Sequence, residues 1–181
     1  MSRRKADRDS VTAAERHRAA ISDAWTIHAA QLDWTAKADA KAAFAFAIDS
    51  AIIATVGVLM STNRVFVHFD RWYLIDTFVL AAVLLAAAIV MASIGVAPSL
   101  LRRSSIAAWP QGFIYFGHAR HWDPVTLAAA LEEKDILPQL SRQIVVTAEV
   151  AWRKHRYVGW SIWLTLVAGG MLVLYAILTR F

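Results

Sequence analysis

Three long apolar stretches dominate the pattern of hydrophobic and polar positions along the chain. They run approximately over residues 42–60, 74–96 and 158–178. A helix needs about 20 mostly apolar residues to cross the hydrocarbon core of a bilayer, and each stretch approaches that length. The pattern therefore predicts three transmembrane helices. The first stretch follows a long charged segment and precedes no small-residue cleavage site, which indicates a retained span.

The segment before the first stretch is also predicted to be helical. It contains no proline or glycine, and Thr12 with Glu15 has the spacing of a capping box. We expect one helix to run from about Thr12 through the first span. Below the span it carries an apolar stripe that needs a packing partner, formed by Ile21, Trp25, His28 and Leu32.

The segment between the second and third stretches supplies that partner. Asp123 followed by Pro124 is a strong helix start, and Asp135 with Pro138 repeats the signal. No helix breaker follows Pro138 until Gly159, so a second long helix is predicted to enter the third span. Its buried side is predicted to carry Leu137, Leu140, Ile144 and Ala151.

These elements predict an all-α integral membrane protein. Its three transmembrane helices are joined to a helical cytoplasmic stalk, which is formed by extensions of the first and third spans. The predicted parts are a cytoplasmic N-terminal helix (1–41), a transmembrane hairpin (42–96), a cytoplasmic helical segment (97–157) and the third transmembrane helix (158–178).

Composition excludes most other classes. The 181 residues are 58% hydrophobic and only 18% charged, which is too apolar for an ordinary soluble domain. The chain lacks cysteine, a phosphate-binding glycine loop, a nucleophile elbow, a metal-ligand cluster and paired carboxylates at catalytic spacing. We therefore expect no catalytic residue, no metal and no cofactor. The net charge of +5 suits an anionic membrane surface as well as nucleic acid, and the spans favour the membrane.

The distribution of lysine and arginine predicts the orientation. Eight of these residues precede the first span and eight lie between the second and third, whereas the loop after the first span has two and the C-terminal tail has one. Short loops rich in lysine and arginine stay in the cytoplasm. The N-terminus and residues 97–157 are therefore predicted to be cytoplasmic.

Three patches resemble the transmembrane effectors of the Pycsar antiphage systems. They are Ala38–Ala42, Tyr115–Ala119, and Leu140–Ile144 followed by Ala148, Ala151 and Lys154. Their order and spacing agree with that family, and the resemblance covers most of the chain from about residue 30. One position differs, because Ala43 occupies a place where the family commonly has glycine.

The resemblance implies a function at the bacterial inner membrane. In that family a partner pyrimidine cyclase makes cyclic UMP or cyclic CMP upon phage infection. The effector then impairs the inner membrane, so infected cells die before phage mature. It implies that this chain binds cUMP or cCMP and acts among inner-membrane lipids by self-assembly or rearrangement, as a homo-oligomer and without a nucleic-acid partner.

Three residues fit the chemistry of such a ligand. A cyclic nucleotide presents one negative phosphodiester and a base edge, so its pocket needs a cation and a group that both donates and accepts. Arg142 and Gln143 supply these at the start of a predicted helix, and His118 lies in the central patch. The alternative roles are a surface arginine, a glutamine bonded to a neighbouring helix and a hydrogen-bonded histidine in an apolar turn.

Asp49, Asp39 and Lys41 are the candidate intramembrane or gating residues. Asp49 lies about two turns inside the first span, where an ionised carboxylate is costly unless it faces protein or water. It is expected either to line a hydrated path that opens on activation or to be a packing residue, helped by neighbours such as Ser50. Asp39 and Lys41 lie at the cytoplasmic edge of the span and face different neighbours. Their alternative roles are pairing with another helix and reaching lipid headgroups.

The sequence is also compatible with two other classes of protein. One is a small channel or transporter subunit without a nucleotide ligand, and the other is a membrane-anchored module that docks a soluble partner. A pyrimidine cyclase gene beside this one would favour the effector.

The orientation is testable with fusions. A reporter fused at Phe181 should read as periplasmic, and one fused within residues 110–135 should read as cytoplasmic, because lysine and arginine hold their loops inside. A cytoplasmic reading at Phe181 would contradict the three-span topology.

Overall fold

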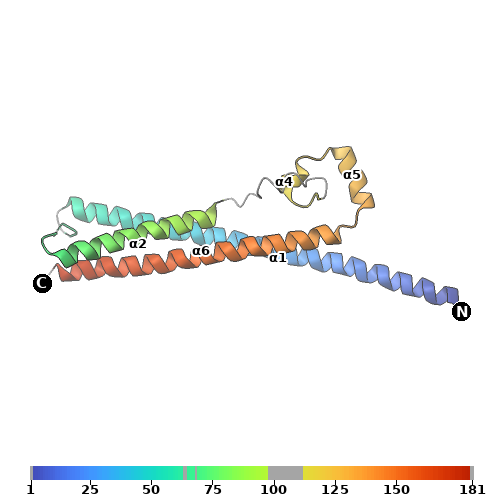
Figure 1. Ribbon diagram of the computed structural model, residues 1–181, viewed down its shortest axis with the longest axis horizontal. Coiled ribbons are helices and arrows are strands. Elements are labelled where there is room, and N and C mark those ends of the chain that lie inside the picture. Colours follow the sequence, from blue (N-terminus) through green and yellow to red (C-terminus); the bar gives the residue numbers. More distant parts are fainter. Residues whose placement is uncertain (1, 63–64, 68, 98–111, 180–181) are drawn as a thin grey trace. The chain divides into compact units, whose positions relative to one another are not determined.

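A computed structural model describes residues 2–62, 65–67, 69–97 and 112–179. Within these residues the elements are helices, namely α1 (Ser2–Ser61), α2 (Trp72–Val96), α4 (Phe116–Ala119), α5 (Pro124–Glu133) and α6 (Leu137–Leu178) (Figure 1). Three of them, α1, α2 and α6, are long and apolar enough to cross a membrane. The prediction of an all-α membrane protein with three spans is confirmed.

The chain divides into two compact units. The first unit comprises Met1–Trp34 and Pro98–Ala151, and the second comprises Thr35–Ala97 and Trp152–Phe181. Both α1 and α6 contribute residues to each unit. The predicted assignment of these parts to cytoplasm and membrane, including the stalk, stays a prediction.

Two of the three predicted helix starts are correct. The Asp123 carboxylate accepts the N–H groups of Val125 (3.1 Å) and Thr126 (3.2 Å), with Pro124 as the first helical residue. Asp135 accepts the N–H of Leu137 (3.0 Å), where α6 begins. The predicted start at Thr12 is wrong, because α1 begins at Ser2. The residues before Thr12 include no glycine or proline, so nothing in the sequence ends the helix there.

In the second unit, α1, α2 and α6 pack side by side (Figure 1). Their buried positions alternate at steps of three and four, the repeat of a left-handed coiled coil. Many of them are small, which lets helix backbones approach closely in a membrane. They include Ala38, Ala42 and Ala45 on α1, Ala81, Ala88, Ala92 and Gly95 on α2, and Ser161 and Ala168 on α6.

The helices of the second unit run in alternating directions. Asp39 pairs with Lys154 and Asp49 with Thr165, so α1 and α6 are parallel with a nearly constant sequence offset of 115 and 116. A Cβ atom added to Gly95, near the end of α2, would lie 3.4 Å from Val158 and 3.7 Å from Ala42. The opposite end of α2 clusters with Leu172 and Tyr175. Thus α2 is antiparallel to both partners.

An aromatic cluster closes the end of the second unit near the loop between α1 and α2. Phe66 is buried and stacks on Tyr175, with ring centroids 5.1 Å apart, while Phe78 lies 5.8 Å from both rings. Phe66 adopts a positive φ of 61°, which is uncommon for a bulky residue. Burial of its ring in the cluster offsets that backbone strain.

In the first unit, the predicted apolar stripe on α1 is only partly correct. His28 is buried, but Trp25 and Leu32 are 43% and 52% exposed, and the buried positions beside His28 are Ala24 and Gln31. The reason is the coiled-coil repeat, which selects positions 24, 28 and 31 and leaves the bulky side chains at its flanks. On α6, Leu140 and Ala151 are buried, as predicted.

Candidate functional site

The second unit contains a fully buried carboxylate. Asp49 is 0% exposed, and the Thr165 hydroxyl donates to its Oδ1 at 2.6 Å. Within the described residues, Asp49 Oδ2 and Ser161 Oγ are buried without a hydrogen-bond partner. The partner proposed from the sequence is wrong, because the Ser50 hydroxyl donates to the carbonyl of Phe46. A residue of α6, which only the tertiary structure identifies, provides the hydrogen bond.

A charged pair lies nearer than Asp49 to the start of the first apolar stretch. Lys154 Nζ donates to Asp39 Oδ1 at 2.6 Å, and the Lys154 side chain is only 10% exposed. Asp39 thus holds the Lys154 ammonium inside the unit, although a lysine just below a predicted span would ordinarily reach the lipid headgroups. Asp39 therefore pairs with a neighbouring helix, which was one of its two expected roles. Lys41 is exposed and faces a different environment from Asp39.

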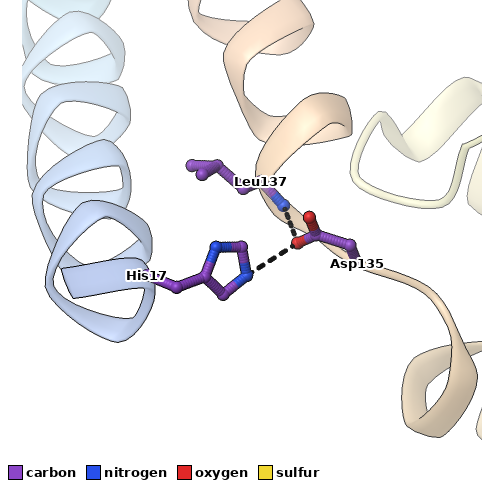
Figure 2. A network of polar contacts seen from close by, with 3 residues as sticks. All are labelled: His17, Asp135 and Leu137. Atoms are coloured by element: carbon purple, nitrogen blue, oxygen red, sulfur yellow. Dashed lines mark hydrogen bonds and ion pairs between the residues drawn. The ribbon is translucent and has the colours of Figure 1, made fainter. Parts of the chain in front are cut away.

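In the first unit, α1 is tied to the beginning of α6. His17 Nε2 donates to Asp135 Oδ1 at 3.1 Å, and the same oxygen accepts the N–H of Leu137 at 3.0 Å (Figure 2). Asp135 thus caps α6 and contacts α1 at once. The sequence offset of 118 is close to the offsets within the second unit.

The loop before α4 brings His118 next to the start of α6 in the first unit. A Cβ atom added to Gly112 would lie 3.5 Å from His118 Nδ1 and 3.6 Å from Gln139 Oε1, so these two side chains flank the same glycine. Gln139 lies four residues before Gln143, on the same face of α6. Gln143 is half-buried, and Arg142 is its exposed neighbour.

The loop from Gly112 to Trp122 is held by specific contacts. The Phe113 N–H donates to Gln139 Oε1 at 3.2 Å, and the Trp122 indole donates to the Gly112 carbonyl at 3.0 Å. A Cβ atom on Gly117 would lie only 2.2 Å from the Tyr115 ring, so any other residue here would displace that ring. Gln139 is not among the residues predicted from the sequence, although its place one turn before Gln143 was a usable signal.

His28, which was predicted to belong to an apolar stripe, is a buried polar group. It is buried in the first unit, and its Nδ1 has no hydrogen-bond partner within the described residues. Burial lowers the pKa of His28 because the charged imidazolium loses hydration. On α6, Gln143 donates to Thr147 Oγ1 at 3.4 Å. Gln31 on α1 and Thr147 on α6 are also buried in this unit.

Comparison with known proteins gives one result. The family model PycTM, described as the Pycsar effector protein domain, matches residues 23–180. No curated protein and no solved structure matches the chain. Ala43, where the family commonly has glycine, is exposed, so its methyl group crowds no helix contact. Among the described residues, no group of three or more histidine, aspartate and glutamate side chains is positioned to hold a metal ion.

The charged pair can be tested with a double-mutant cycle. Asp39→Asn should destabilise the protein by about 1–3 kcal/mol, because it leaves a buried ammonium without its counter-charge. Lys154→Met combined with Asp39→Asn should cost less than Asp39→Asn alone, since no buried charge remains. Thermal unfolding in detergent micelles measures both, with Lys37→Met as the exposed control. An Asp39→Asn variant as stable as the control would show that the pair contributes nothing.

Proposed function

Because the chain belongs to the Pycsar effector protein family, we propose that a cyclic pyrimidine nucleotide activates it to impair the bacterial inner membrane. The ligand is cUMP or cCMP, made by a partner pyrimidine cyclase upon phage infection, and the outcome is abortive infection. The observation that carries this proposal is the family match over residues 23–180, in a chain with three helices able to span a membrane.

In this proposal the N-terminus and the first unit lie in the cytoplasm, where the nucleotide is made. The excess of lysine and arginine before the first span and between the second and third supports that orientation. The two long helices α1 and α6 contribute to both units, so a change in the first unit has a covalent route into the second.

The nucleotide binds in the first unit beside the start of α6. Arg142 supplies the exposed cation for the phosphodiester, and the carboxamide of Gln143 and the imidazole of His118 read the base edge. Support comes from His118 and Gln139, whose side chains both lie beside Gly112, with Gln139 one helical turn before Gln143 on α6. Gln139 acts as a positioning residue, because it holds the Gly112–Trp122 loop through the Phe113 N–H.

In the second unit, the opening of a hydrated path through the membrane depends on Asp49. In this structure its Oδ1 is bonded by Thr165, while its Oδ2 and Ser161 Oγ are buried without partners among the described residues. Each unsatisfied buried polar group costs about 1–3 kcal/mol. A rearrangement that admits water to this contact recovers part of that cost and exposes a carboxylate to a cation path. A few kcal/mol of differential binding by the nucleotide is enough to change the dominant state.

The acting form is a homo-oligomer. Support comes from the first unit, where Trp25, Leu32 and Trp34 on α1 are exposed at the flanks of the buried positions. Large exposed apolar groups of this kind outside a membrane commonly mark protein contacts. Association of several copies also brings several Asp49 carboxylates into one assembly.

The proposed nucleotide site is tested by replacing Arg142 and Gln143, which supply its cation and its amide. Arg142→Ala with Gln143→Ala should abolish nucleotide-triggered dye leakage from proteoliposomes while membrane insertion stays normal, because the cation and the amide are lost. Ser141→Ala, at the exposed neighbouring position, is the matched control. The assay compares cUMP, cCMP and no nucleotide. Normal leakage from the double variant would refute the assignment of these residues.

The role of Asp49 is tested by depolarisation of the inner membrane after induced signalling. Asp49→Asn should keep the hydrogen bond from Thr165 but reduce cation flux, and Asp49→Leu should abolish toxicity without impairing insertion. Ser50→Ala, whose hydroxyl bonds only its own helix backbone, is the control. Equal depolarisation in wild type and both Asp49 variants would reduce this carboxylate to a packing residue.

A further inference from the structure

A groove of about 450 Å³ runs along one face of the second unit. Its walls come from two helices, α1 and α6, and they are Ala40, Lys41, Phe44, Ala45, Ile48, Ile162, Thr165 and Leu166. No residue of α2 lines it. The groove therefore lies in the predicted membrane-spanning part, on the side of the α1–α6 pair that α2 leaves uncovered.

The length of the groove matches one leaflet of a bilayer. With an offset of about 116 between the two helices, Leu166 lies level with residue 50 of α1. The groove thus extends from Ala40 to that level, roughly ten residues, or about 15 Å along the helix axis. This is about half of the 30 Å hydrocarbon core. A single acyl chain entering from the leaflet at the Lys41 end would fill it.

The groove wall offers almost no hydrogen-bonding group along this length. Phe44 and Leu166 are 69% and 61% exposed, and Ile48 and Ile162 add further apolar surface. The Thr165 hydroxyl is engaged by Asp49 and by the carbonyl of Ser161 at 3.0 Å, so its methyl group is what remains for the groove. Such a wall suits a hydrocarbon chain and does not suit a nucleotide.

Lys41 lies at one end of the groove, and no described residue neutralises its positive charge. Lys41 makes no hydrogen bond or ion pair within the described residues, although Asp39 is only two positions away. Asp39 is already engaged by Lys154. The ammonium of Lys41 is thus available at the level where the first apolar stretch begins, which is the level of phospholipid headgroups.

We propose that this groove is a binding site for an anionic phospholipid. One acyl chain occupies the apolar channel between α1 and α6, and the phosphate group binds the Lys41 ammonium. The inference does not depend on the proposed nucleotide response, because it uses only the geometry of the second unit.

Native mass spectrometry of the full chain in mild detergent tests the site. Phosphatidylglycerol and phosphatidylethanolamine with identical acyl chains are added stepwise, and the bound fractions are compared. Phosphatidylglycerol should bind about fivefold more tightly, which is the effect expected of one lysine near a membrane surface. Lys41→Gln should remove this preference, because it weakens phosphatidylglycerol binding more than phosphatidylethanolamine binding. Lys37→Gln, one turn earlier on α1 and outside the groove, should retain the preference.

A second variant tests the apolar channel. Ala40→Trp places a bulky side chain at an exposed groove position, and it should weaken binding of both lipids if the acyl chain lies there. Circular dichroism and size-exclusion chromatography establish that the variants fold. Equal binding of the two lipids by wild type, or a preference that survives Lys41→Gln, would overturn the proposal. So would a dimer that Ala40→Trp disrupts while lipid binding is unchanged, because a second copy would then occupy the groove.

Discussion

The close parallel contact of α1 with α6 in the second unit is the constraint on which the other features depend. Small residues at steps of three and four allow the backbones to approach, and this leaves room for few polar groups. Those present must find partners across the contact, as Lys154 does with Asp39 and Thr165 with Asp49. The two bonds share nearly the same sequence offset, so they fix the register that apolar packing alone leaves loosely defined.

The polar groups in this contact differ in how fully they are satisfied. The Asp39–Lys154 pair has a counter-charge and partial access to solvent, so it stabilises one arrangement. Asp49 and Ser161 each keep a buried atom without a partner among the described residues, and such atoms favour any state that hydrates them. The second unit therefore combines a fixed point near the start of the first apolar stretch with a less satisfied point deeper inside it. Thr165 also lines the groove, so a lipid there would contact the residue that holds Asp49.

The first unit follows the same helix repeat but adds a loop with its own chemistry. His118 and Gln139 both lie beside Gly112, and Gly117 allows the Tyr115 ring to pack onto the turn. The caps at Asp123 and Asp135 define where α5 and α6 begin. The loop thereby brings His118 next to Gln139 in the first turn of α6.

The sequence by itself determined the helices, their approximate ends, the three spans and the family. These depend on hydrophobic period, breakers and caps, which are local properties of the chain. Only the tertiary structure decided which side chains meet. The stripe through Trp25 and Leu32 failed because a 3.5-residue repeat, set by the neighbouring helix, selected Ala24, His28 and Gln31. The partners of Asp49 and Lys154 lie more than 110 positions away, and no local pattern encodes a register between helices so distant in sequence.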